Sequence, residues 1–456
     1  MKSNLLLSSM PLKLNRSIFF RKYFDELYLY DTKCNKNYIF NSVATDIIEV
    51  ISENPSIDFN DLIEKLFVIY KAPKDILSHD ALNFVNILFE KGILYQDNYI
   101  PEIEKTEIPF EKQIAQKLSM NTGNNKTLLS VLLELTYRCN EKCIHCYATE
   151  DKPSEQKELT TNEWFEVLDQ LYKNNVMFLT LTGGEVAVRS DFFDIFDYAI
   201  KKCFVIDIFS NGMAFSDNQI ADIACRYPKS FQSSIYSHIP ETHDKITRVK
   251  GSFEKTLHTL NEFKKLGVPI VVKTVMMKEN CYDYDGLRNL VNDLGATLQV
   301  GTSIGAKNDG SFSPLFHRIE EDNILMPILK GEIIRQKSVP SNKELDMSLC
   351  GAGFNGISIN PYGDVFPCNS LDIKLGSVKE QTISDIWAES VELEKVRNLS
   401  ISNLLKCNCC DCLNYCQFCP GLALAETGLL EPYPEACKIA KIRRSVMEGG
   451  KAIESI

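Results

Sequence analysis

Residues 128–147, LLSVLLELTYRCNEKCIHCY, join an apolar, strand-like run to a loop with three closely spaced cysteines. Cys139, Cys143 and Cys146 have the spacing C-x3-C-x2-C, which supplies three thiolates to a cubic cluster of four irons. One iron then has no protein ligand, and it can chelate the amino and carboxylate groups of a small molecule. Zinc is the alternative metal, but a zinc site usually has four protein ligands, paired as C-x2-C.

After this stretch begins, apolar strands alternate with amphipathic helices as far as about residue 305. The pattern predicts strands at 128–136, 178–182, 205–210, 231–236, 269–276 and 297–301. It predicts helices near 162–173, 191–202, 216–226, 252–266 and 284–294. Six β/α units with parallel strands imply an α/β fold, a partial (β/α)6 barrel of the TIM type, with its chemistry at the C-terminal strand ends. The cysteine loop lies at that end of the first strand.

Glycine and polar residues end the next two strands. Gly183, Gly184 and Glu185 follow the second strand, where glycine lets the backbone approach a ligand and a carboxylate can accept hydrogen bonds from an ammonium group. Ser210 and Asn211 follow the third strand, and an Asn-Gly turn without a ligand is the alternative interpretation there.

Two later strands carry polar residues that we expect to face the barrel lumen. Ser234 belongs to a run in which polar and apolar residues alternate, as they do when one face of a strand is polar. Lys273 interrupts an otherwise apolar strand. Because a charge is rarely buried without a partner, a ligand carboxylate or a neighbouring acid is expected beside it.

The cysteine loop, with the aromatic Tyr147 directly after its third cysteine, resembles the loop of the radical S-adenosylmethionine (SAM) enzymes. The run 183–185 matches the GGE motif of that family, although Val186 replaces the usual proline after it. The resemblance implies a SAM-binding 4Fe–4S cluster whose electron cleaves SAM, so that a 5′-deoxyadenosyl radical abstracts a substrate hydrogen. The SAM contacts that it implies are Tyr147, Gly183, Gly184, Glu185, Ser210, Asn211, Ser234 and Lys273.

Nine of the sixteen cysteines lie between Cys350 and Cys437. In a compartment that keeps thiols reduced, such clustering indicates metal or redox chemistry rather than disulfides. The segment begins with the spacing C-x12-G-x4-C, and residues 360–364 fit a hairpin turn between two strands. It resembles the SPASM extension, which carries two auxiliary 4Fe–4S clusters in peptide-modifying radical SAM enzymes.

The SPASM resemblance implies an inner auxiliary cluster on Cys350, Cys368 and Cys419, and an outer one on Cys407, Cys410, Cys416 and Cys437. Cys419 arrives one residue earlier than in the family spacing C-x2-C-x5-C-x3-C, while Cys409 and Cys412 are extra and are alternative ligands. An inner cluster with only three ligands would have an open iron, which a substrate thiolate could bind. A zinc ribbon is the alternative interpretation of this segment.

Four scattered cysteines are more often small buried residues than reactive ones. Cys281 is the exception, because it follows the fifth predicted strand near the catalytic face. It is a candidate catalytic residue, for example as a hydrogen donor, and a core or loop position is the alternative.

The first 98 residues predict a small winged-helix-like domain, with short strands at 18–20, 27–30 and 38–40 and helices at 43–51, 59–70 and 73–90. Its 11 Lys and Arg residues against 13 Asp and Glu residues disfavour nucleic-acid binding. The order resembles the PqqD-like domains, which bind the leader peptides of ribosomally made, modified peptides. The leader would add as a strand beside the third helix, and a purely structural cap is the alternative.

Composition limits the remaining choices. The 456-residue chain has a formal charge of −11, which argues against broad nucleic-acid binding. Its apolar runs are too short to span a membrane and its start does not resemble a signal peptide, so we expect a cytoplasmic protein. We predict a recognition domain at 1–98, a linker at 99–126, the radical SAM barrel at 127–305, a bridging region at 306–345, the SPASM domain at 346–445 and a tail at 446–456.

Together the three segments resemble a radical SAM/SPASM maturase of the sactipeptide and ranthipeptide type. This implies an oxidoreductase that crosslinks a precursor peptide, most simply through a thioether, with an electron donor such as flavodoxin or ferredoxin. Carbon–carbon crosslinking, protein-residue oxidation as in sulfatase maturation, and quinone or redox-cofactor maturation are the alternatives within this enzyme class. A zinc-binding winged-helix regulator is the alternative outside it.

Overall fold

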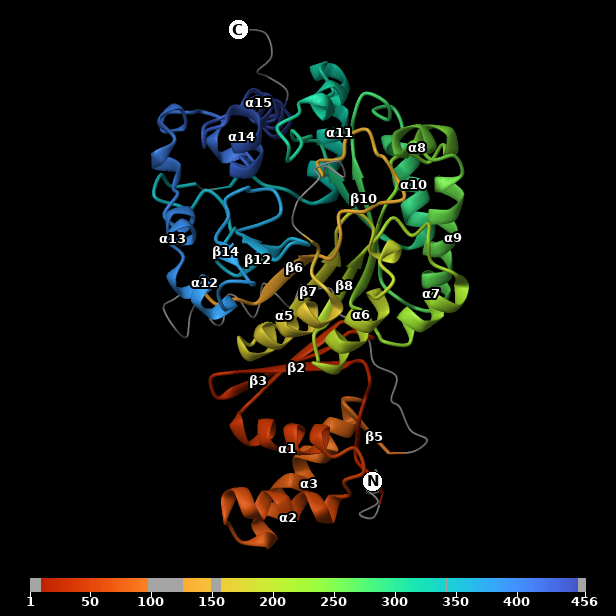
Figure 1. Ribbon diagram of the computed structural model, residues 1–456, viewed down its shortest axis with the longest axis vertical. Coiled ribbons are helices and arrows are strands. Elements are labelled where there is room, and N and C mark those ends of the chain that lie inside the picture. Colours follow the sequence, from red (N-terminus) through yellow and green to blue (C-terminus); the bar gives the residue numbers. More distant parts are fainter. Residues whose placement is uncertain (1–9, 97–125, 149–156, 342, 450–456) are drawn as a thin grey trace.

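The computed structural model describes residues 10–96, 126–148, 157–341 and 343–449. The linker expected at 99–126 lies outside the described residues except for Lys126, and so does the expected tail from residue 450 onward. Figure 1 shows an N-terminal domain below a central barrel, with the cysteine-rich C-terminal region beside and above it. None of the helices described is long and apolar enough to cross a bilayer.

The centre of the molecule is a parallel sheet of six consecutive strands (Figure 1). Each strand pairs in parallel with the next along the chain. This order confirms the predicted partial barrel. Its strands are β6 (Ser130–Glu134), β7 (Phe178–Thr182), β8 (Val205–Phe209), β9 (Ser230–Ser234), β10 (Ile270–Val275) and β11 (Thr297–Gly301).

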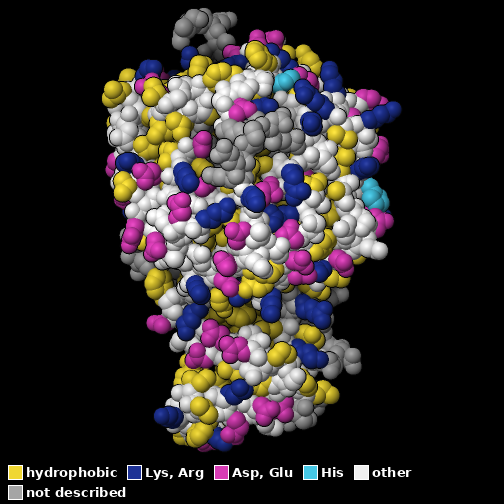
Figure 2. Space-filling view, viewed as in Figure 1, with side chains coloured by type: hydrophobic (Ala, Val, Ile, Leu, Met, Phe, Trp, Pro, Cys, Tyr) yellow, Lys and Arg dark blue, Asp and Glu magenta, His cyan; other side chains and the backbone are white. Residues whose placement is uncertain are grey.

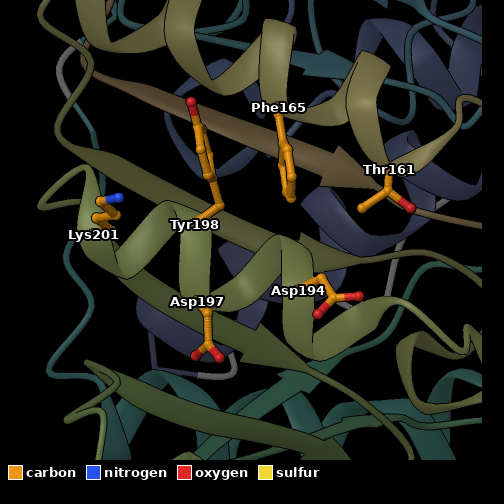
Figure 3. A pocket seen from close by; sticks show the side chains of 6 residues that line it. All are labelled: Thr161, Phe165, Asp194, Asp197, Tyr198 and Lys201. Atoms are coloured by element: carbon orange, nitrogen blue, oxygen red, sulfur yellow. The ribbon is translucent and has the colours of Figure 1, made fainter.

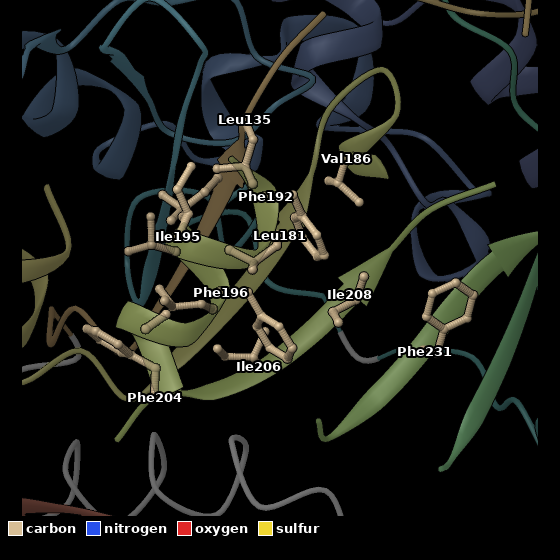
Figure 4. Packing of buried hydrophobic residues seen from close by; sticks show 14 of the residues in the cluster. Leu135, Leu181, Val186, Phe192, Ile195, Phe196, Phe204, Ile206, Ile208 and Phe231 are labelled. Atoms are coloured by element: carbon tan, nitrogen blue, oxygen red, sulfur yellow. The ribbon is translucent and has the colours of Figure 1, made fainter. Parts of the chain in front are cut away.

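Helices cover the outer face of this sheet because every second strand residue is apolar. Leu181 of β7 and Ile206 and Ile208 of β8 pack against Phe192 and Phe196 (Figure 4). The covering helices are α5 (Thr161–Lys173), α6 (Phe192–Lys201), α7 (Asp217–Ala224), α8 (Pro240–Thr247), α9 (Ser252–Lys265) and α10 (Tyr284–Leu294). The short helix α8 was not predicted from the sequence.

The C-terminal region continues the barrel sheet rather than folding apart from it. β12 (Gly356–Ile359) pairs in parallel with β6, and then antiparallel with β13 (Asp364–Phe366), which pairs with β14 (Gly376–Ser377). The hairpin predicted around residues 360–364 is therefore present. Ile357 and Ile359 join the apolar core of the barrel. The hairpin, which lies between Cys350 and Cys368 in sequence, is therefore packed beside β6.

The remaining C-terminal elements are helices, some of which lie beside this hairpin and others above it (Figure 1). Among them, α11 and α15 contact each other through an apolar cluster that includes Leu325, Ile328 and Ile439. The helices are α11 (Asp322–Arg335), α12 (Ile383–Glu389), α13 (Val391–Arg397), α14 (Pro420–Thr427) and α15 (Pro434–Met447). The first of these lies in the expected bridging region.

The N-terminal domain has the three strands and three helices that the sequence predicts. An antiparallel sheet of β2 (Ile18–Tyr23), β3 (Glu26–Asp31) and β4 (Lys36–Phe40) is followed by α1 (Ser42–Glu53), α2 (Phe59–Tyr70) and α3 (Lys74–Glu90). Asp58 caps α2 by accepting a hydrogen bond from the Asp61 amide. A further pair, β1 (Lys13–Leu14) with β5 (Leu94–Tyr95), closes the domain.

This domain is fixed to the end of the barrel where the strands begin. Phe19, Tyr28 and Tyr30 pack against Leu129 and Phe178, which lie at the starts of β6 and β7. The buried Arg21 guanidinium donates to the carbonyl oxygens of Val176 at 2.9 Å and Lys202 at 2.7 Å. It also lies 4.8 Å from the ring centroids of both Tyr172 and Phe204. The domain therefore sits opposite the C-terminal strand ends.

Replacing Arg21 with Ala is expected to destabilise this junction. The change removes two charge-assisted hydrogen bonds to barrel carbonyls and leaves those carbonyls without their donor, at a cost of about 2–4 kcal/mol. Chemical denaturation followed by circular dichroism measures the loss. Lys22→Ala is the matched control, because Lys22 lies on the opposite side of the same strand and should change stability by less than about 0.5 kcal/mol. Equal losses in the two variants would contradict the proposed anchoring.

Candidate active site

The loop with Cys139, Cys143 and Cys146 lies at the C-terminal end of β6, where the sequence predicts it. Two backbone hydrogen bonds hold the loop against the end of α8, from the Lys142 amide to Thr247 O at 3.1 Å and from the Ile144 amide to Ile246 O at 3.0 Å. Burial raises the pKa of Cys139 to about 12 and also raises that of Cys143. Iron binding would therefore release protons from these thiols as it forms the thiolates.

The two glycines of the GGE run are required by the cysteine loop itself. A β-carbon on Gly183 would lie 2.3 Å from Thr136 O, and one on Gly184 would lie 2.5 Å from Arg138 O. The Gly184 amide donates to Thr136 O at 2.7 Å and the Glu185 amide donates to Arg138 O at 2.9 Å. We expected the glycines to make room for a ligand. In the structure they let β7 clamp the backbone that leads into Cys139.

Glu185, Ser210 and Asn211 come together as one hydrogen-bonded group. The Glu185 carboxylate is fully buried and accepts from Ser210 Oγ at 2.7 Å, the Asn211 amide at 2.7 Å and the Ala187 amide at 2.8 Å. Burial raises its pKa and these three donors oppose that rise. A carboxylate has about four acceptor positions, so these three donors leave one position unused.

Ser234 and Lys273 face the lumen as neighbours on β9 and β10, paired in register. The Lys273 ammonium lies 4.1 Å from the ring centroid of Phe209 on β8. Burial lowers its pKa, and Asp207 partly offsets this. None of the ion pairs among the described residues involves Lys273, so Asp207 is the expected neighbouring acid only at longer range, and the ring of Phe209 lies closer to the ammonium.

The Tyr147 hydroxyl has two partners within the protein, and its contact with SAM stays a prediction. Its hydroxyl donates to Glu134 Oε1 at 2.9 Å and accepts from Asn369 Nδ2 at 3.3 Å. Glu134 is a buried lumen residue of β6, only 4% exposed. Its second oxygen accepts from the Tyr137 hydroxyl at 2.9 Å. The side chain of Tyr147 thus joins the cysteine loop to the C-terminal hairpin.

Three further polar residues shape this site and were not predicted from the sequence. Glu134 looked like an interruption of an apolar strand, although its period-2 position relative to Thr136 and Leu132 marks it as facing the lumen. The carboxylate of Glu158 accepts from Thr136 Oγ1 at 2.7 Å. The buried Arg189 donates to Leu135 O and to Leu159 O, both at 2.7 Å. These contacts join segments far apart in the sequence.

The structure brings Cys350, Cys368 and Cys419 together beside the barrel. Burial raises the pKa of Cys368 most, and the nearby thiols of Cys419 and Cys350 raise it further. The pKa of Cys350 is raised in the same way, by burial and then by the nearby thiol of Cys419. Cys419 therefore lies near Cys350 and Cys368, although it is one residue closer to Cys416 in sequence than the family spacing requires.

Cys407, Cys410, Cys416 and Cys437 form a second group, separate from the first. Burial raises the pKa of Cys407 to about 11, and the thiols of Cys416, Cys410 and Cys437 add to this rise. The Lys343 ammonium opposes it, and the same ammonium donates to Cys416 O at 2.5 Å. The SPASM resemblance assigns these same residues to the inner and outer ligand sets, and their role as cluster ligands stays a prediction.

The spare cysteines occupy other surroundings. Cys409 is exposed, and Cys412 lies beside the Arg444 guanidinium, which opposes the rise in its pKa that burial causes. Cys281 is 8% exposed within the apolar cluster between α10, α11 and α15, and its thiol donates to Lys278 O at 3.3 Å. This is the core position that was the alternative for Cys281, and it gives the thiol no contact with the lumen.

The donor sets fit iron–sulfur clusters better than zinc. Among the described residues, no three Cys, His, Asp or Glu side chains converge on a point where a single ion could sit. Zinc needs four ligands about 2.0–2.3 Å from one centre. In a cubane each thiolate binds a different iron, so the thiolates surround a larger group. Three thiols beside a carboxylate with a spare acceptor suit a cluster that holds an amino acid.

An open pocket on the outside of the barrel is unrelated to this site. Thr161 and Phe165 of α5 and Asp194, Asp197, Tyr198 and Lys201 of α6 line it (Figure 3). The rings of Phe165 and Tyr198 stack with centroids 4.2 Å apart. Since α5 and α6 cover the outer face of the sheet, the pocket is separated from the lumen by β6 and β7.

Comparisons with known proteins agree with this site. The family model for the Radical SAM superfamily matches residues 133–289, and that for the SPASM iron–sulfur cluster-binding domain matches residues 350–412. The AdoMet-dependent heme synthase of Methanosarcina barkeri is 26% identical over 65% of this chain and 92% of its own. The subtilosin biosynthesis protein AlbA of Bacillus subtilis is 28% identical over 58% of each chain.

A solved structure has a similar fold over most of the chain. Streptococcus suis SuiB, crystallised with its precursor peptide SuiA, aligns with 91% of this chain and 97% of its own, with a TM-score of 0.57 and 14% identity. This similarity shows the fold. Because the alignment takes in nine-tenths of the chain, it extends beyond the barrel to its neighbouring regions.

The fold and the cysteine loop define an iron–sulfur enzyme that uses SAM. This chain has a radical SAM domain followed by a SPASM domain, and its cofactors are SAM and 4Fe–4S clusters. The SPASM match ends at residue 412, before Cys416, Cys419 and Cys437, so the assignment of these three rests on the structure and on the family spacing.

Proposed function

We propose that this enzyme forms an intramolecular crosslink, a thioether, in a ribosomally made precursor peptide. The observation that carries the proposal is the inner group of Cys350, Cys368 and Cys419, in which no fourth cysteine of the described residues takes part. A cluster held by three thiolates has an iron free for the thiolate of a substrate cysteine. AlbA is a subtilosin biosynthesis protein and SuiB binds a precursor peptide, which supports a peptide as the substrate.

Cys139, Cys143 and Cys146 would hold the SAM cluster, and Glu185 would accept a hydrogen bond from the SAM ammonium group. When bound, these cofactors supply a 5′-deoxyadenosyl radical that takes a substrate hydrogen atom, and an auxiliary cluster accepts the electron released on crosslinking. The chain itself orients and encloses the reactants. Lys273 places a positive charge in the lumen, where it would pair with a carboxylate of SAM or of the peptide.

We infer that the N-terminal domain binds the leader part of the precursor. β4 pairs only with β3 among the described strands, so its other edge can take an added strand. Beside that edge, Phe40 of β4 packs edge-on against Phe84 of α3, and Ile39 and Ile87 are 36% and 41% exposed. Lys and Arg side chains alternate with Asp and Glu side chains over the visible face of this domain (Figure 2).

The position of the domain sets a minimum length for the precursor. β4 lies beyond the N-terminal strand ends, while the cysteine loop lies at the C-terminal ends. A six-residue strand such as β10 is about 20 Å long. The segment between leader and modified residue must therefore span more than about 20 Å, which takes at least six or seven extended residues.

Leader binding is tested by placing charge beside the β4 edge. Ile39→Glu and Ile87→Glu should each weaken binding of a fluorescent precursor peptide by about tenfold, because each puts a carboxylate where an apolar leader residue would pack. Val68→Glu is the matched control, because Val68 is 73% exposed on α2 and lies away from the β4 edge. Equal affinities in all three variants would refute leader binding at β4.

The crosslink is tested with anaerobically purified protein, SAM, dithionite and a short peptide encoded beside the gene. We expect release of 5′-deoxyadenosine and a peptide lighter by two hydrogens, with its cysteine no longer alkylated by iodoacetamide. The same mass change with a free cysteine would exclude a thioether and favour a carbon–carbon bond. Release of 5′-deoxyadenosine without any change in the peptide would refute the proposed substrate.

A further inference from the structure

Two residues that directly follow cysteines of different groups contact each other. Tyr147 follows Cys146 of the SAM-cluster loop, and Asn369 follows Cys368 of the inner auxiliary group. Asn369 Nδ2 donates to the Tyr147 hydroxyl at 3.3 Å. A direct hydrogen bond therefore joins the two loops, between the residues that directly follow Cys146 and Cys368.

Glu134 anchors this contact to the barrel. It ends β6, is 4% exposed, and accepts the Tyr147 hydroxyl proton on one oxygen and the Tyr137 hydroxyl proton on the other, both at 2.9 Å. Among the described residues, no Lys, Arg or His side chain forms an ion pair with it. A buried carboxylate without a counter-ion is costly. Its position is explained by the two tyrosines that it orients.

The network is continuous from strand to hairpin. Because Tyr147 donates to Glu134, its hydroxyl oxygen is turned so that a lone pair accepts from Asn369. β12 of the hairpin pairs with β6, which ends at Glu134, and Asn369 lies in the turn that follows β13 of the same sheet. The backbone of Tyr147 is also held, because the Tyr147 carbonyl oxygen accepts a hydrogen bond from the Asn308 amide at 3.0 Å.

We propose that Glu134, Tyr147 and Asn369 form a bridge that fixes the position of the inner auxiliary cluster relative to the SAM cluster. Glu134 and Tyr147 are positioning residues in this account. The consequence for turnover rests on the proposed function: the peptide must lie between the radical and the inner cluster, and an error of about 1 Å in such a geometry can cost about 100-fold in rate. Loosening the bridge should then let SAM be cleaved without a crosslink.

Tyr147→Phe tests the bridge, because it keeps the ring but removes the hydrogen bonds to Glu134 and Asn369. Tyr137→Phe is the matched control, since it removes the other hydrogen bond to Glu134 and leaves Asn369 in place. Asn369→Ala breaks the same bridge from the opposite loop. Each reconstituted variant is compared with the wild type for iron content, for the spin–spin coupling between the reduced SAM and inner clusters, and for 5′-deoxyadenosine released per crosslinked peptide.

We expect full iron content in all variants, an altered spin–spin coupling in Tyr147→Phe and Asn369→Ala, and a wild-type coupling in Tyr137→Phe. The ratio of 5′-deoxyadenosine to product should rise at least about fivefold in the first two. Wild-type coupling and ratio in both bridge variants would overturn the inference. If Tyr147→Phe did not assemble its clusters, Asn369→Ala alone would decide. Wild-type protein that cleaves SAM but leaves the peptide unchanged would refute the proposed function, while the coupling measurement would still decide the bridge.

Discussion

Replacing Cys143 with Ala is expected to abolish SAM cleavage. The change leaves two thiolates for the SAM cluster, too few to hold it, so iron should fall by about four per chain and 5′-deoxyadenosine should fall to the level measured without protein. Iron and sulfide analysis of anaerobically reconstituted protein, together with chromatography of the reaction products, measures both effects. The auxiliary clusters should remain, because their cysteines lie in the C-terminal region.

Cys225→Ala is the control for this experiment. Cys225 is exposed at the end of α7 on the outside of the barrel, so its loss should change neither iron content nor SAM cleavage. Undiminished SAM cleavage in the Cys143 variant would show that Cys139, Cys143 and Cys146 do not hold the reactive cluster. The same result is expected for Cys139→Ala and Cys146→Ala, since each removes one of the same three ligands.

Replacing Cys407 with Ala should remove the outer auxiliary cluster, whereas replacing its neighbour Cys409 should not. Cys407 lies with Cys410, Cys416 and Cys437, while Cys409 is exposed outside that group. We expect Cys407→Ala to lose about four irons per chain and to stop forming crosslinked peptide, and Cys409→Ala to keep the wild-type value of both. Iron analysis and Mössbauer spectra of the two variants give the comparison.

Either of two results would change the ligand assignment. A loss of four irons in Cys409→Ala would make that residue a true ligand and would require the loop 407–412 to rearrange on cluster binding. Full iron content in Cys407→Ala would instead indicate that Cys412 replaces it. Cys412 is held near the Arg444 guanidinium, which makes this second outcome the less expected one.

The barrel strands could be predicted because apolar and polar residues alternate over an apolar outer face. The predicted bounds 178–182 and 297–301 equal those of β7 and β11. The helix over 59–70 was also found with its predicted bounds, because Asp58 marks its start. In each case the pattern is local, so one short segment is enough to determine it.

Other elements depend on contacts that no local pattern contains. The helix α11 has Pro327 in its interior, where proline normally breaks a helix, and it is held by packing against α15. α8 has only eight residues and begins at Pro240, with five residues between it and the end of β9, so its local pattern is too short to indicate a helix. The pairing of β12 with β6 joins residues more than 220 positions apart, which spacing alone could not indicate.

The candidate site also contains features that could be predicted from the sequence and others that depend on contacts made only in the folded chain. Cysteine spacing was enough to separate the loop of Cys139, Cys143 and Cys146 from the C-terminal cysteines. The division of the C-terminal cysteines came from the family resemblance, because Cys419 and Cys437 lie far in sequence from residues of their own groups. Glycine at 183 and 184 was found, but its physical reason was not, because the close approach of the Thr136 and Arg138 carbonyls appears only in the folded chain. The Tyr147 hydrogen bonds to Glu134 and Asn369 were missed for the same reason.

The central claim is that the cluster on Cys139, Cys143 and Cys146 has an iron that SAM chelates directly. Electron–nuclear double resonance of the reduced protein, with SAM labelled by ¹⁵N at its amino group and ¹⁷O at its carboxylate, measures this contact. The account predicts hyperfine coupling from both labels in the wild type and from neither in Cys143→Ala. A reduced wild-type cluster that shows no coupling to either label, at SAM concentrations that saturate binding, would contradict it.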